Sequence, residues 1–321
     1  MRLDYQGPWP EPIGFLLLPR FSMMAFFSAV EPLRIANRIA GKEVFCWHVI
    51  SQDGQPISAS NGMTLLADTS LDSAPPLASL AVVASFEPEA TLSRELIRWL
   101  NRLAQRGCVL GGIDTGSFIL ARAGLLERQR VTMHWESLPT FRERFPEIDA
   151  TESLYEISTE RFSCAGGAAA MDMALAMITR RHGDELANAV SEQLIHARMR
   201  TQHDHQRLTL TRRLGTHRHA LIEAVALMEQ HIEMPLSVGD IAERVGISLR
   251  QLQRLFEQEL TASPRDHYLA LRLGRGRQLL KETDHDILSI SLACGFTSPS
   301  SFSRAYKGRY SLSPRSDRHP D

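Results

Sequence analysis

An internal repeat in the last third of the chain limits the possible folds more than any other feature. Two segments, residues 241–256 and 290–306, each combine a short apolar helix pattern, a glycine and a longer helix pattern. Gly246 and Gly295 lie 49 residues apart, and equivalent positions beyond one inserted residue lie 50 apart. Glycine allows the positive φ that a tight turn between helices needs. The repeat therefore predicts two helix-turn-helix units.

The second helix of each copy combines a buried face with a polar face. In the first copy Leu252 and Phe256 share the buried face, and a serine precedes the helix as a cap; Thr297 or Ser298 has this place in the second copy. Arg, Gln and Ser on a free helix face can reach bases and phosphates in the major groove. We therefore predict double-stranded DNA as a partner, contacted by Ser248, Arg250, Gln251, Gln253, Arg254, Ser298, Ser300, Ser301, Ser303, Arg304 and Lys307. The alternative is a helical bundle without a DNA role, which a single glycine turn would leave open and a duplicated one disfavours.

A known family shares this pattern. Phe302-Ser-Arg-Ala-Tyr-Lys307 followed by Ser313-Pro314 resembles the signature segment of the AraC/XylS regulators, and the resemblance covers about residues 217–318. It implies a regulator, expected here to be an activator, that binds promoter DNA and works with RNA polymerase. Ser311 departs from the family, in which glycine is common at this position.

The net charge of −1 conceals an uneven distribution. Residues 1–211 carry 20 Lys and Arg against 24 Asp and Glu, whereas residues 212–321 carry 16 against 13. Only the C-terminal part is basic, and only mildly. Charge therefore permits nucleic acid as a partner without identifying it.

The first two-thirds of the chain alternate between strand and helix patterns. Apolar runs such as residues 13–18 are typical of strands buried on both faces. Such alternation predicts an α/β domain with a parallel sheet. We expect this domain over residues 12–198, a polar linker over 199–216, and an all-α DNA-binding domain over 217–318. The expected strands are 13–18, 44–51, 80–84, 108–110, 155–158 and 161–165, and the expected helices are 28–39, 91–106, 168–181, 184–199 and 266–282.

Residues 111–126 have the layout of a nucleophile elbow, in which a tight strand-to-helix turn displays one side chain. The displayed residue is Asp114, and Thr132-Met-His-Trp-Glu136 follows. With Glu31-Pro32-Leu33, these motifs resemble the PfpI-like members of the class I glutamine amidotransferase superfamily, in the GlxA-type form fused to AraC domains. The resemblance covers about residues 12–195 and implies a flavodoxin-like sheet.

In the enzymes of this superfamily the elbow carries a cysteine nucleophile, which a histidine assists. Here the elbow has Asp114, and the helper-acid position falls on Ala25. A carboxylate is a far weaker nucleophile than a thiolate, so we expect no enzymatic activity. Cys108 and Cys164 lie in apolar, strand-like contexts and are interpreted as core residues. The alternative is an amidase-like hydrolase with an accessory helical domain, which a hydrolysis assay would distinguish.

We predict that the elbow binds a small-molecule effector. A carboxylate beside an aromatic ring suits a cationic amine, and the amino end of a helix suits a carboxylate, so a zwitterion meets both demands. The motifs also resemble the subgroup associated with carnitine, glycine betaine and dimethylglycine. The alternatives are another amino acid or amine, or no ligand, with Asp114 as a helix cap. The predicted ligand residues are Glu31, Asp114, Thr115, His134, Trp135 and Glu136.

Other features favour a cytoplasmic protein without a cofactor or metal. No apolar run approaches the roughly 20 residues of a transmembrane helix, and the start lacks the pattern of a signal peptide. The four cysteines are scattered, without the spacing of a metal site or a disulfide framework. A homodimer is consistent with the prediction, since two DNA-binding domains on two half-sites gain avidity.

Overall fold

The computed structural model describes residues 1–207, 209–283 and 285–318. It divides into two compact units, Met1–Gln206 and Arg207–Asp321, called here the N-terminal and C-terminal units. The division falls inside the predicted linker, 199–216. Residue 208 of this linker lies outside the described residues, as does residue 284 of the predicted DNA-binding domain. None of the described helices combines the length and apolar character that crossing a bilayer requires.

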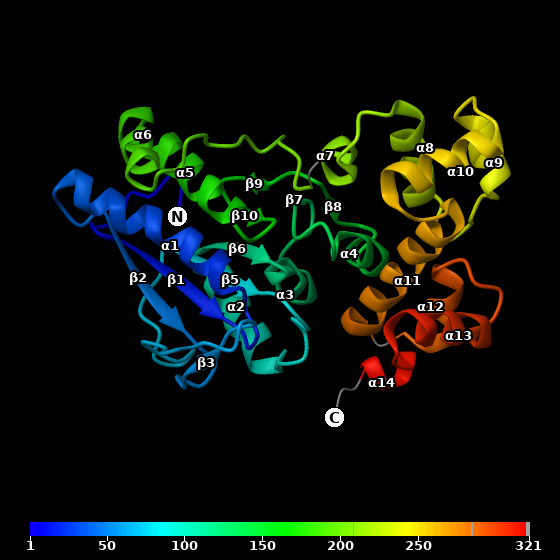
Figure 1. The fold of residues 1–321 in the computed structure, drawn as a ribbon. Helices are drawn as coiled ribbons and strands as arrows, with labels where there is room; N and C mark the ends of the chain where they lie inside the picture. Colours follow the sequence, from blue (N-terminus) through cyan, green and yellow to red (C-terminus); the bar gives the residue numbers. More distant parts are fainter. Residues whose placement is uncertain (208, 284, 319–321) are drawn as a thin grey trace. The chain divides into compact units, whose positions relative to one another are not determined.

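A six-stranded sheet forms the centre of the N-terminal unit (Figure 1). The strand order is β2-β1-β5-β6-β10-β9, and every neighbouring pair is parallel except β10 and β9. This confirms the predicted α/β class. The strands are β1 (Glu11–Leu17), β2 (Phe45–Ile50), β5 (Ser79–Ala84), β6 (Val109–Asp114), β9 (Tyr155–Ile157) and β10 (Arg161–Cys164).

Helices cover both faces of this sheet. Along β1, Ile13 and Phe15 belong to one apolar core and Leu16 to the other, as expected of a strand buried on both faces. The first core includes α1 (Met23–Ala40), α5 (Ala169–His182) and α6 (Asp184–Gln193). The second includes α2 (Arg94–Gln105), α3 (Gly116–Arg122) and α4 (Leu138–Arg144). Two short strand pairs, β3 (Ile57–Ser58) with β4 (Thr64–Leu65) and β7 (Arg130–Val131) with β8 (Asp149–Ala150), complete the unit.

Two predicted elements have different bounds in the structure. The strand expected at 108–110 begins at Val109 and continues through the glycines to Asp114. At Gly111 only glycine fits, because a Cβ there would lie 2.1 Å from the Phe162 ring. The helix expected over 184–199 ends at Gln193. Ile195 then has a φ of 55°, and the chain that follows binds to α5 instead of continuing the helix.

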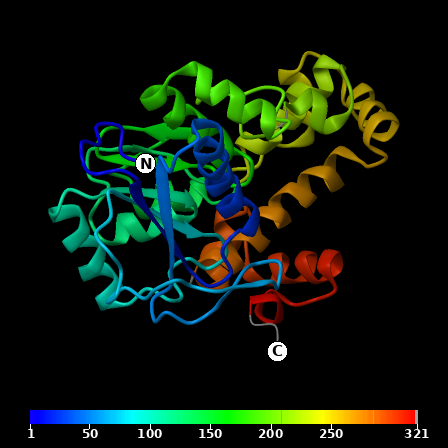
Figure 2. The ribbon, with the colours of Figure 1, turned by 90° about the vertical axis from the view of Figure 1, so that its left-hand side faces the viewer.

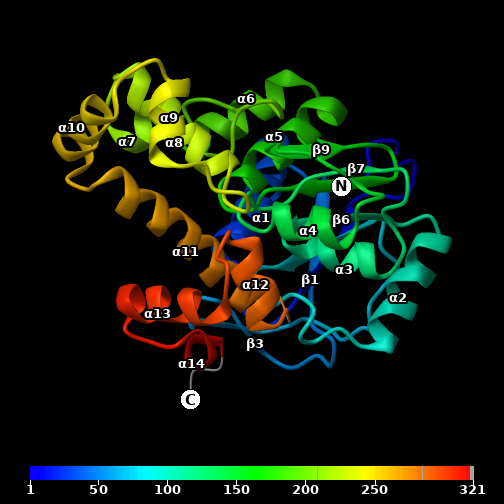
Figure 3. The ribbon, with the colours of Figure 1, turned by 90° about the vertical axis from the view of Figure 1, so that its right-hand side faces the viewer.

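All described regular elements of the C-terminal unit are helices, as predicted. The long helix α11 (Pro264–Glu282), orange in Figures 2 and 3, runs from one small bundle to the other. It contributes Tyr268 to the core of the first bundle and Leu273 and Leu279 to that of the second. The remaining helices are α7 (Leu210–Leu214), α8 (His219–Gln230), α9 (Val238–Arg244), α10 (Leu249–Leu260), α12 (Ile287–Ala293), α13 (Pro299–Tyr310) and α14 (Pro314–Arg318).

Both predicted glycine turns are present. Gly246 and Gly295 have φ values of 73° and 71°, and they join α9 to α10 and α12 to α13, the first and second helix-turn-helix. Their surroundings differ. A Cβ at Gly246 would meet open space, whereas one at Gly295 would lie 2.4 Å from Pro235 Cγ and 2.6 Å from the Ile232 carbonyl oxygen. The second turn therefore packs directly against the loop between α8 and α9.

Candidate functional site

The elbow in the N-terminal unit is a tight turn with Asp114 at its tip. Asp114 ends β6 with a φ of 61°, a left-handed conformation that non-glycine residues seldom adopt, and is 7% exposed. A Cβ at Gly166 would lie 2.7 Å from the Asp114 Cβ, and one at Gly116 would lie 2.0 Å from the Val82 carbonyl oxygen. Two glycines are thus required for the close packing that holds this carboxylate in place.

Thr115 fixes the turn from the other side. It has the N-cap position of α3, but its side chain makes no capping hydrogen bond. The Thr115 hydroxyl instead donates to the Ser85 carbonyl oxygen at 2.6 Å, at the end of the neighbouring strand β5. Because Ala84 and Asp114 are paired in the sheet register, the elbow lies at the carboxyl ends of adjacent parallel strands, where open α/β sheets bind ligands.

The segment 132–136 is tied to the helix that follows the elbow. The Ser117 hydroxyl donates to the Thr132 carbonyl oxygen at 3.1 Å, and the Thr132 N–H donates to the Ser163 hydroxyl at 2.8 Å. Ser117 lies in the first turn of α3, three residues after Asp114. The structure thus connects the two motifs that were singled out in the sequence.

His134, Trp135 and Glu136 follow on this segment. The rings of His134 and Trp135 lie 5.4 Å apart, and Trp135 is 37% exposed. Burial lowers the pKa of His134, and Glu136, with Oε2 3.9 Å from His134 Nδ1, opposes that shift. The histidine is therefore a neutral hydrogen-bonding group at pH 7, and the tryptophan offers an accessible aromatic surface.

Glu31 is differently placed. It lies in α1, and its carboxylate binds the Arg34 guanidinium, with Nε and Nη2 at 3.0 and 2.7 Å from Oε2. This is an ion pair along one helix surface, of the kind that neighbouring turns form. The described contacts of Glu31 thus stay within α1, unlike those of Thr115 and the 132–136 segment.

The thiols of the N-terminal unit are unsuited to nucleophilic chemistry. Burial raises the pKa of Cys108 to about 12 and that of Cys164 to about 12, the latter against hydrogen bonds from the backbone N–H groups of Gly166 and Asp114. Both thiols are protonated at neutral pH, whereas reactive cysteines have lowered pKa values. Within the described ranges, no three His, Cys, Asp or Glu side chains gather as metal ligands.

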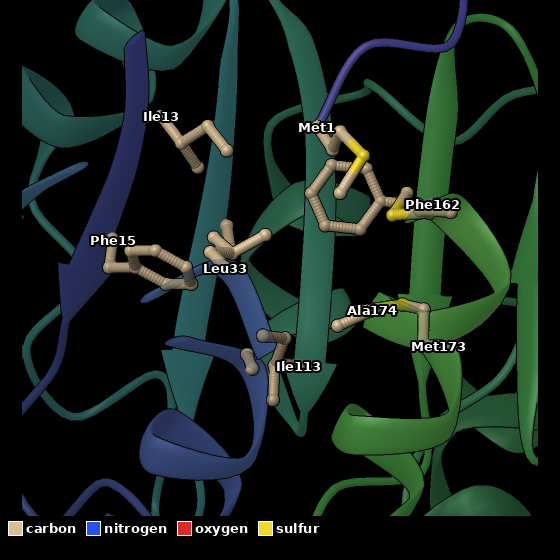
Figure 4. A pocket seen from close by; sticks show the side chains of 11 residues that line it. Met1, Ile13, Phe15, Leu33, Ile113, Phe162, Met173 and Ala174 are labelled. Carbon is tan, nitrogen blue, oxygen red and sulfur yellow. The ribbon is translucent and has the colours of Figure 1, made fainter. Parts of the chain in front are cut away.

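The same unit contains an apolar cavity whose lining includes Ile113, the residue before Asp114 (Figure 4). It lies in the core between the sheet and the helices α1 and α5, and Figure 4 shows Ile13, Phe15, Leu33 and Phe162 around it. All its lining side chains are apolar. Such a cavity cannot compensate the desolvation of a charged amine or a carboxylate.

The first predicted DNA-reading helix, α10, begins with a capping box. Ser248 Oγ accepts from the Gln251 N–H at 3.2 Å, and Gln251 Oε1 accepts from the Ser248 N–H at 2.8 Å. The serine cap could be predicted from the sequence, whereas the return bond to Gln251 could not. Because that oxygen is engaged, Gln251 retains only its amide N–H groups for a ligand. Arg250, Gln253 and Arg254 are exposed, while Leu252 and Phe256 are buried.

The second predicted DNA-reading helix, α13, is capped by Ser298, which resolves the choice between Thr297 and Ser298. Ser298 Oγ accepts from the Ser301 N–H at 3.3 Å, and the Ser301 hydroxyl donates to the Ser298 carbonyl oxygen at 2.8 Å. These two serines therefore hold the start of the helix. Ser300, Arg304 and Lys307 are exposed, and Ser303 is half-buried.

A charged cluster behind α13 was not identified from the sequence. Asp317, 4% exposed, accepts from the Tyr306 hydroxyl at 2.6 Å and from Arg277 Nε at 2.8 Å, and Lys281 Nζ lies 3.4 Å away. Arg272 also donates to the Cys294 and Gly295 carbonyl oxygens at 2.8 and 2.6 Å, at the end of α12. The only sequence signal is the repeat register, which aligns Asp317 with His267.

Comparisons with known proteins agree with this division of the chain. Residues 13–178 match the DJ-1/PfpI family, and residues 241–319 match a helix-turn-helix domain. The HTH-type transcriptional regulator CdhR of Pseudomonas aeruginosa is 47% identical over 95% of this chain and 90% of its own length. GbdR of the same species is 42% identical over 96% of this chain and 84% of its own length. GlxA of Rhizobium meliloti is 35% identical over 95% of this chain and 94% of its own length. Both are named HTH-type transcriptional regulators.

A solved structure supports the same assignment. The crystal structure of an AraC family transcriptional regulator from Pseudomonas putida covers 58% of this chain and 100% of its own, with 32% identity and a TM-score of 0.54. A THiJ/PfpI family protein from Pseudomonas syringae, 21% identical over 69% of this chain and 89% of its own with a TM-score of 0.52, shares the fold. The chain belongs to the AraC-type transcriptional regulators that carry an N-terminal DJ-1/PfpI domain.

Proposed function

We propose that this regulator binds specific promoter sequences through α10 and α13 and activates its target genes when a small amine binds near Asp114. The observation that carries the DNA role is the duplicated helix-turn-helix. Each copy presents a serine-capped helix whose exposed face holds donors, including Arg250 and Arg254 in one and Arg304 and Lys307 in the other. Arginine can donate two hydrogen bonds to a guanine edge or contact phosphates.

The DNA role can be tested by titrating the full chain with promoter fragments from its own genomic neighbourhood at several salt concentrations. Affinity should fall steeply with salt, since phosphate contacts release counterions. Arg254→Ala, or Arg304→Ala at the equivalent repeat position, should weaken specific binding by about 1–3 kcal/mol if the arginine reads a base. Arg98→Ala, at an exposed position of α2, should have no effect. Failure to bind any such fragment at low salt would contradict the proposal.

The effector proposal depends on Asp114. Its carboxylate lies at a nearly buried turn, where attraction to a cation is stronger than in open water. Trp135 provides an aromatic surface on the segment that Ser117 ties to α3, and aromatic faces attract quaternary and methylated ammonium groups. Glycine betaine, dimethylglycine and carnitine, which combine such a group with a carboxylate, are the favoured effectors.

Calorimetric titration of these three compounds into wild type and Asp114→Asn tests the effector site. Asparagine keeps the size of the side chain but removes the charge, so affinity should fall ten- to a hundred-fold, or about 1.5–3 kcal/mol. Glu43→Gln, at an exposed position before β2, is the matched control; it should change affinity less than about twofold. Equal affinity of Asp114→Asn and wild type would exclude Asp114 as the cation ligand.

We further propose that the protein is not an enzyme and acts in the cytoplasm with RNA polymerase, as a homodimer on DNA. A carboxylate instead of a thiolate at the elbow, and thiols whose pKa values burial raises to about 12 at Cys108 and Cys164, support the absence of catalysis. The names of the relatives, all HTH-type transcriptional regulators, support the regulatory role.

A further inference from the structure

The chain that leaves α6, residues 194–206, is bound to the N-terminal unit and is called here the connector. Its first attachment is the carboxylate of Asp172 in α5, which is 1% exposed. His196 Nε2 lies 3.0 Å from Oδ1, and the Arg200 guanidinium donates to Oδ2 through Nε and Nη2 at 2.9 and 2.6 Å. A buried carboxylate with two such partners is a strong attachment, so this segment is not the solvated linker that its composition indicates.

The connector then follows the start of β9. The Leu154 N–H donates to the Gln202 carbonyl oxygen at 2.9 Å, and the Tyr155 hydroxyl donates to the Arg200 carbonyl oxygen at 3.4 Å. β9 is the edge strand of the sheet, so these two hydrogen bonds hold the connector beside the start of that edge strand.

The last residue of the connector, Gln206, forms its second attachment. Gln206 Nε2 lies 3.1 Å from Thr132 Oγ1, 3.0 Å from the Met133 carbonyl oxygen and 2.9 Å from the Ser153 carbonyl oxygen. The amide has only two N–H groups for these three acceptors. Its Oε1 is buried and has no hydrogen-bond partner among the described residues. The polar atoms of Gln206 therefore have fewer of their hydrogen bonds satisfied than the carboxylate of Asp172 does. This second attachment can be rearranged.

Gln206 binds directly beside the candidate effector site. Two of its acceptors belong to Thr132 and Met133, immediately before His134. Thr132 is fully buried and accepts from Ser117 in the first turn of α3. A continuous set of hydrogen bonds thus leads from the elbow helix through Thr132 to the end of the connector.

The next residue along the chain already belongs to the C-terminal unit. Arg207 Nη2 lies 3.6 Å from Glu229 Oε1 in α8, and Arg213 Nη2 from α7 lies 2.6 Å from the same oxygen. Leu210 and Leu214 of α7 pack against the core of the first helix-turn-helix. The last attachment to one unit and the first to the other are therefore consecutive residues.

We propose that Gln206 is a releasable clip that couples the 132–136 segment to the connector, so that an effector bound at this segment changes how the connector is held. A ligand shifts a two-state equilibrium only by binding one state better than the other. Here the two states are Gln206 bound to, or released from, Thr132, Met133 and Ser153. The role of the effector depends on the function proposed above, whereas the coupling between segment and connector can be measured without any ligand.

Hydrogen–deuterium exchange of the full chain tests the coupling. Gln206→Leu replaces the amide by a shorter apolar side chain and removes its hydrogen bonds. We expect about tenfold faster exchange both in the connector and in residues 132–136, with no change in β5. Thr132→Val removes one acceptor from the other side and should loosen the connector as well. His203→Ala, at an exposed position of the connector, is the matched control and should change neither segment. Faster exchange confined to the mutated segment in both clip variants would overturn the proposal.

Addition of glycine betaine or dimethylglycine then tests the role of the clip in signalling. Wild type should bind one of them and change exchange in the connector and expression from a reporter. Gln206→Leu should bind the same compound within about threefold but lose both responses. An unchanged reporter response in Gln206→Leu would refute the clip. If wild type binds neither compound while the segment and the connector still loosen together, the effector proposal fails and the clip is supported.

Discussion

The two copies of the helix-turn-helix have kept the same frame but stabilise it by different contacts. In both, a serine caps the second helix, Ser248 and Ser298, and the twelve-residue helix ends at a left-handed residue, Thr261 and Ser311. Behind the helix the copies differ. The aromatic position is Phe256 in the first and Tyr306 in the second, at the same repeat register.

The partners of these aromatic residues explain the difference. The Phe256 ring packs edge-on against His267, with the centroids 5.5 Å apart, and His267 Nε2 is buried without a hydrogen-bond partner among the described residues. The Tyr306 hydroxyl instead donates to Asp317, which also binds Arg277 of α11. The two copies thus share their helix caps and turns. They differ in the contacts that attach them to α11, which are ring packing in the first copy and an ionic cluster in the second.

Removal of the ionic cluster should have the largest effect. Asp317→Ala would leave the Tyr306 hydroxyl buried without an acceptor and Arg277 without its partner, at a cost of about 3 kcal/mol. His267→Ala, at the equivalent position, should cost about 1 kcal/mol through lost packing. Hydrogen exchange in α13 and α10 of the full chain measures the two effects separately. Equal destabilisation would mean that the two fastenings are energetically equivalent.

Mild acid should separate the two copies. Burial lowers the pKa of His267, although Glu229 opposes the shift. Below about pH 6.5 the unfolded state therefore binds more protons than the folded state. The free energy of unfolding of the first copy thus decreases as the pH decreases. Burial raises the pKa of Asp317, but hydrogen bonds from Tyr306 and Arg277 outweigh burial and hold it below its usual value. The stability from Asp317 is thus complete above about pH 4 and is lost only as the pH falls through the lowered pKa.

Exchange protection, corrected for the intrinsic pH dependence of exchange, should therefore fall in α10 but not in α13 between about pH 7 and 5. His267→Gln should remove this difference, because glutamine does not titrate. A parallel loss in both helices of wild type would show that another group controls the response to acid.

The smallest effect should come from the left-handed residues. Thr261 and Ser311 have φ values of 52° and 60°, where a non-glycine residue is strained and a β-branched one most of all. Glycine at either position should stabilise its copy by about 0.5–1 kcal/mol, and more at Thr261, as denaturant unfolding would show. Gln258→Gly, at an exposed position inside α10, should destabilise by a similar amount. Stabilisation at Ser311 alone would mean that the turn at Thr261 is relaxed.

The elements that depend on local signals could be predicted from the sequence. Apolar runs such as residues 13–18 predicted the buried strands, and the repeat predicted both helix-turn-helix units with their glycine turns. The elbow could be identified because an apolar strand, glycines and a helix follow one another within residues 111–126. Within the candidate ligand site, the relation between Asp114 and the 132–136 segment followed from the resemblance, and the structure adds the Ser117 bond that connects them.

The contacts between distant polar residues could not be predicted. Asp172 binds Arg200 across 28 positions of the chain, and Gln206 binds Thr132 across 74. Polar residues in such a segment are equally typical of a solvated linker, and no periodicity indicates which partner each will find. The same holds for Arg272, whose bonds to the end of α12 depend on the crossing of two helices.

The close approach at Gly295 has a consequence for the DNA that this regulator can recognise. The second turn packs against Pro235 and the Ile232 carbonyl, with no space for even a methyl group, and this contact opposes a hinge movement between the two halves of the C-terminal unit. If α10 and α13 read the DNA as proposed, this contact restricts the separation of the two base sequences that they recognise. An operator with one base pair inserted between these two base sequences would have to twist or bend to be bound. The energy of that deformation would lower the affinity, by an amount that depends on base pairs that no side chain contacts.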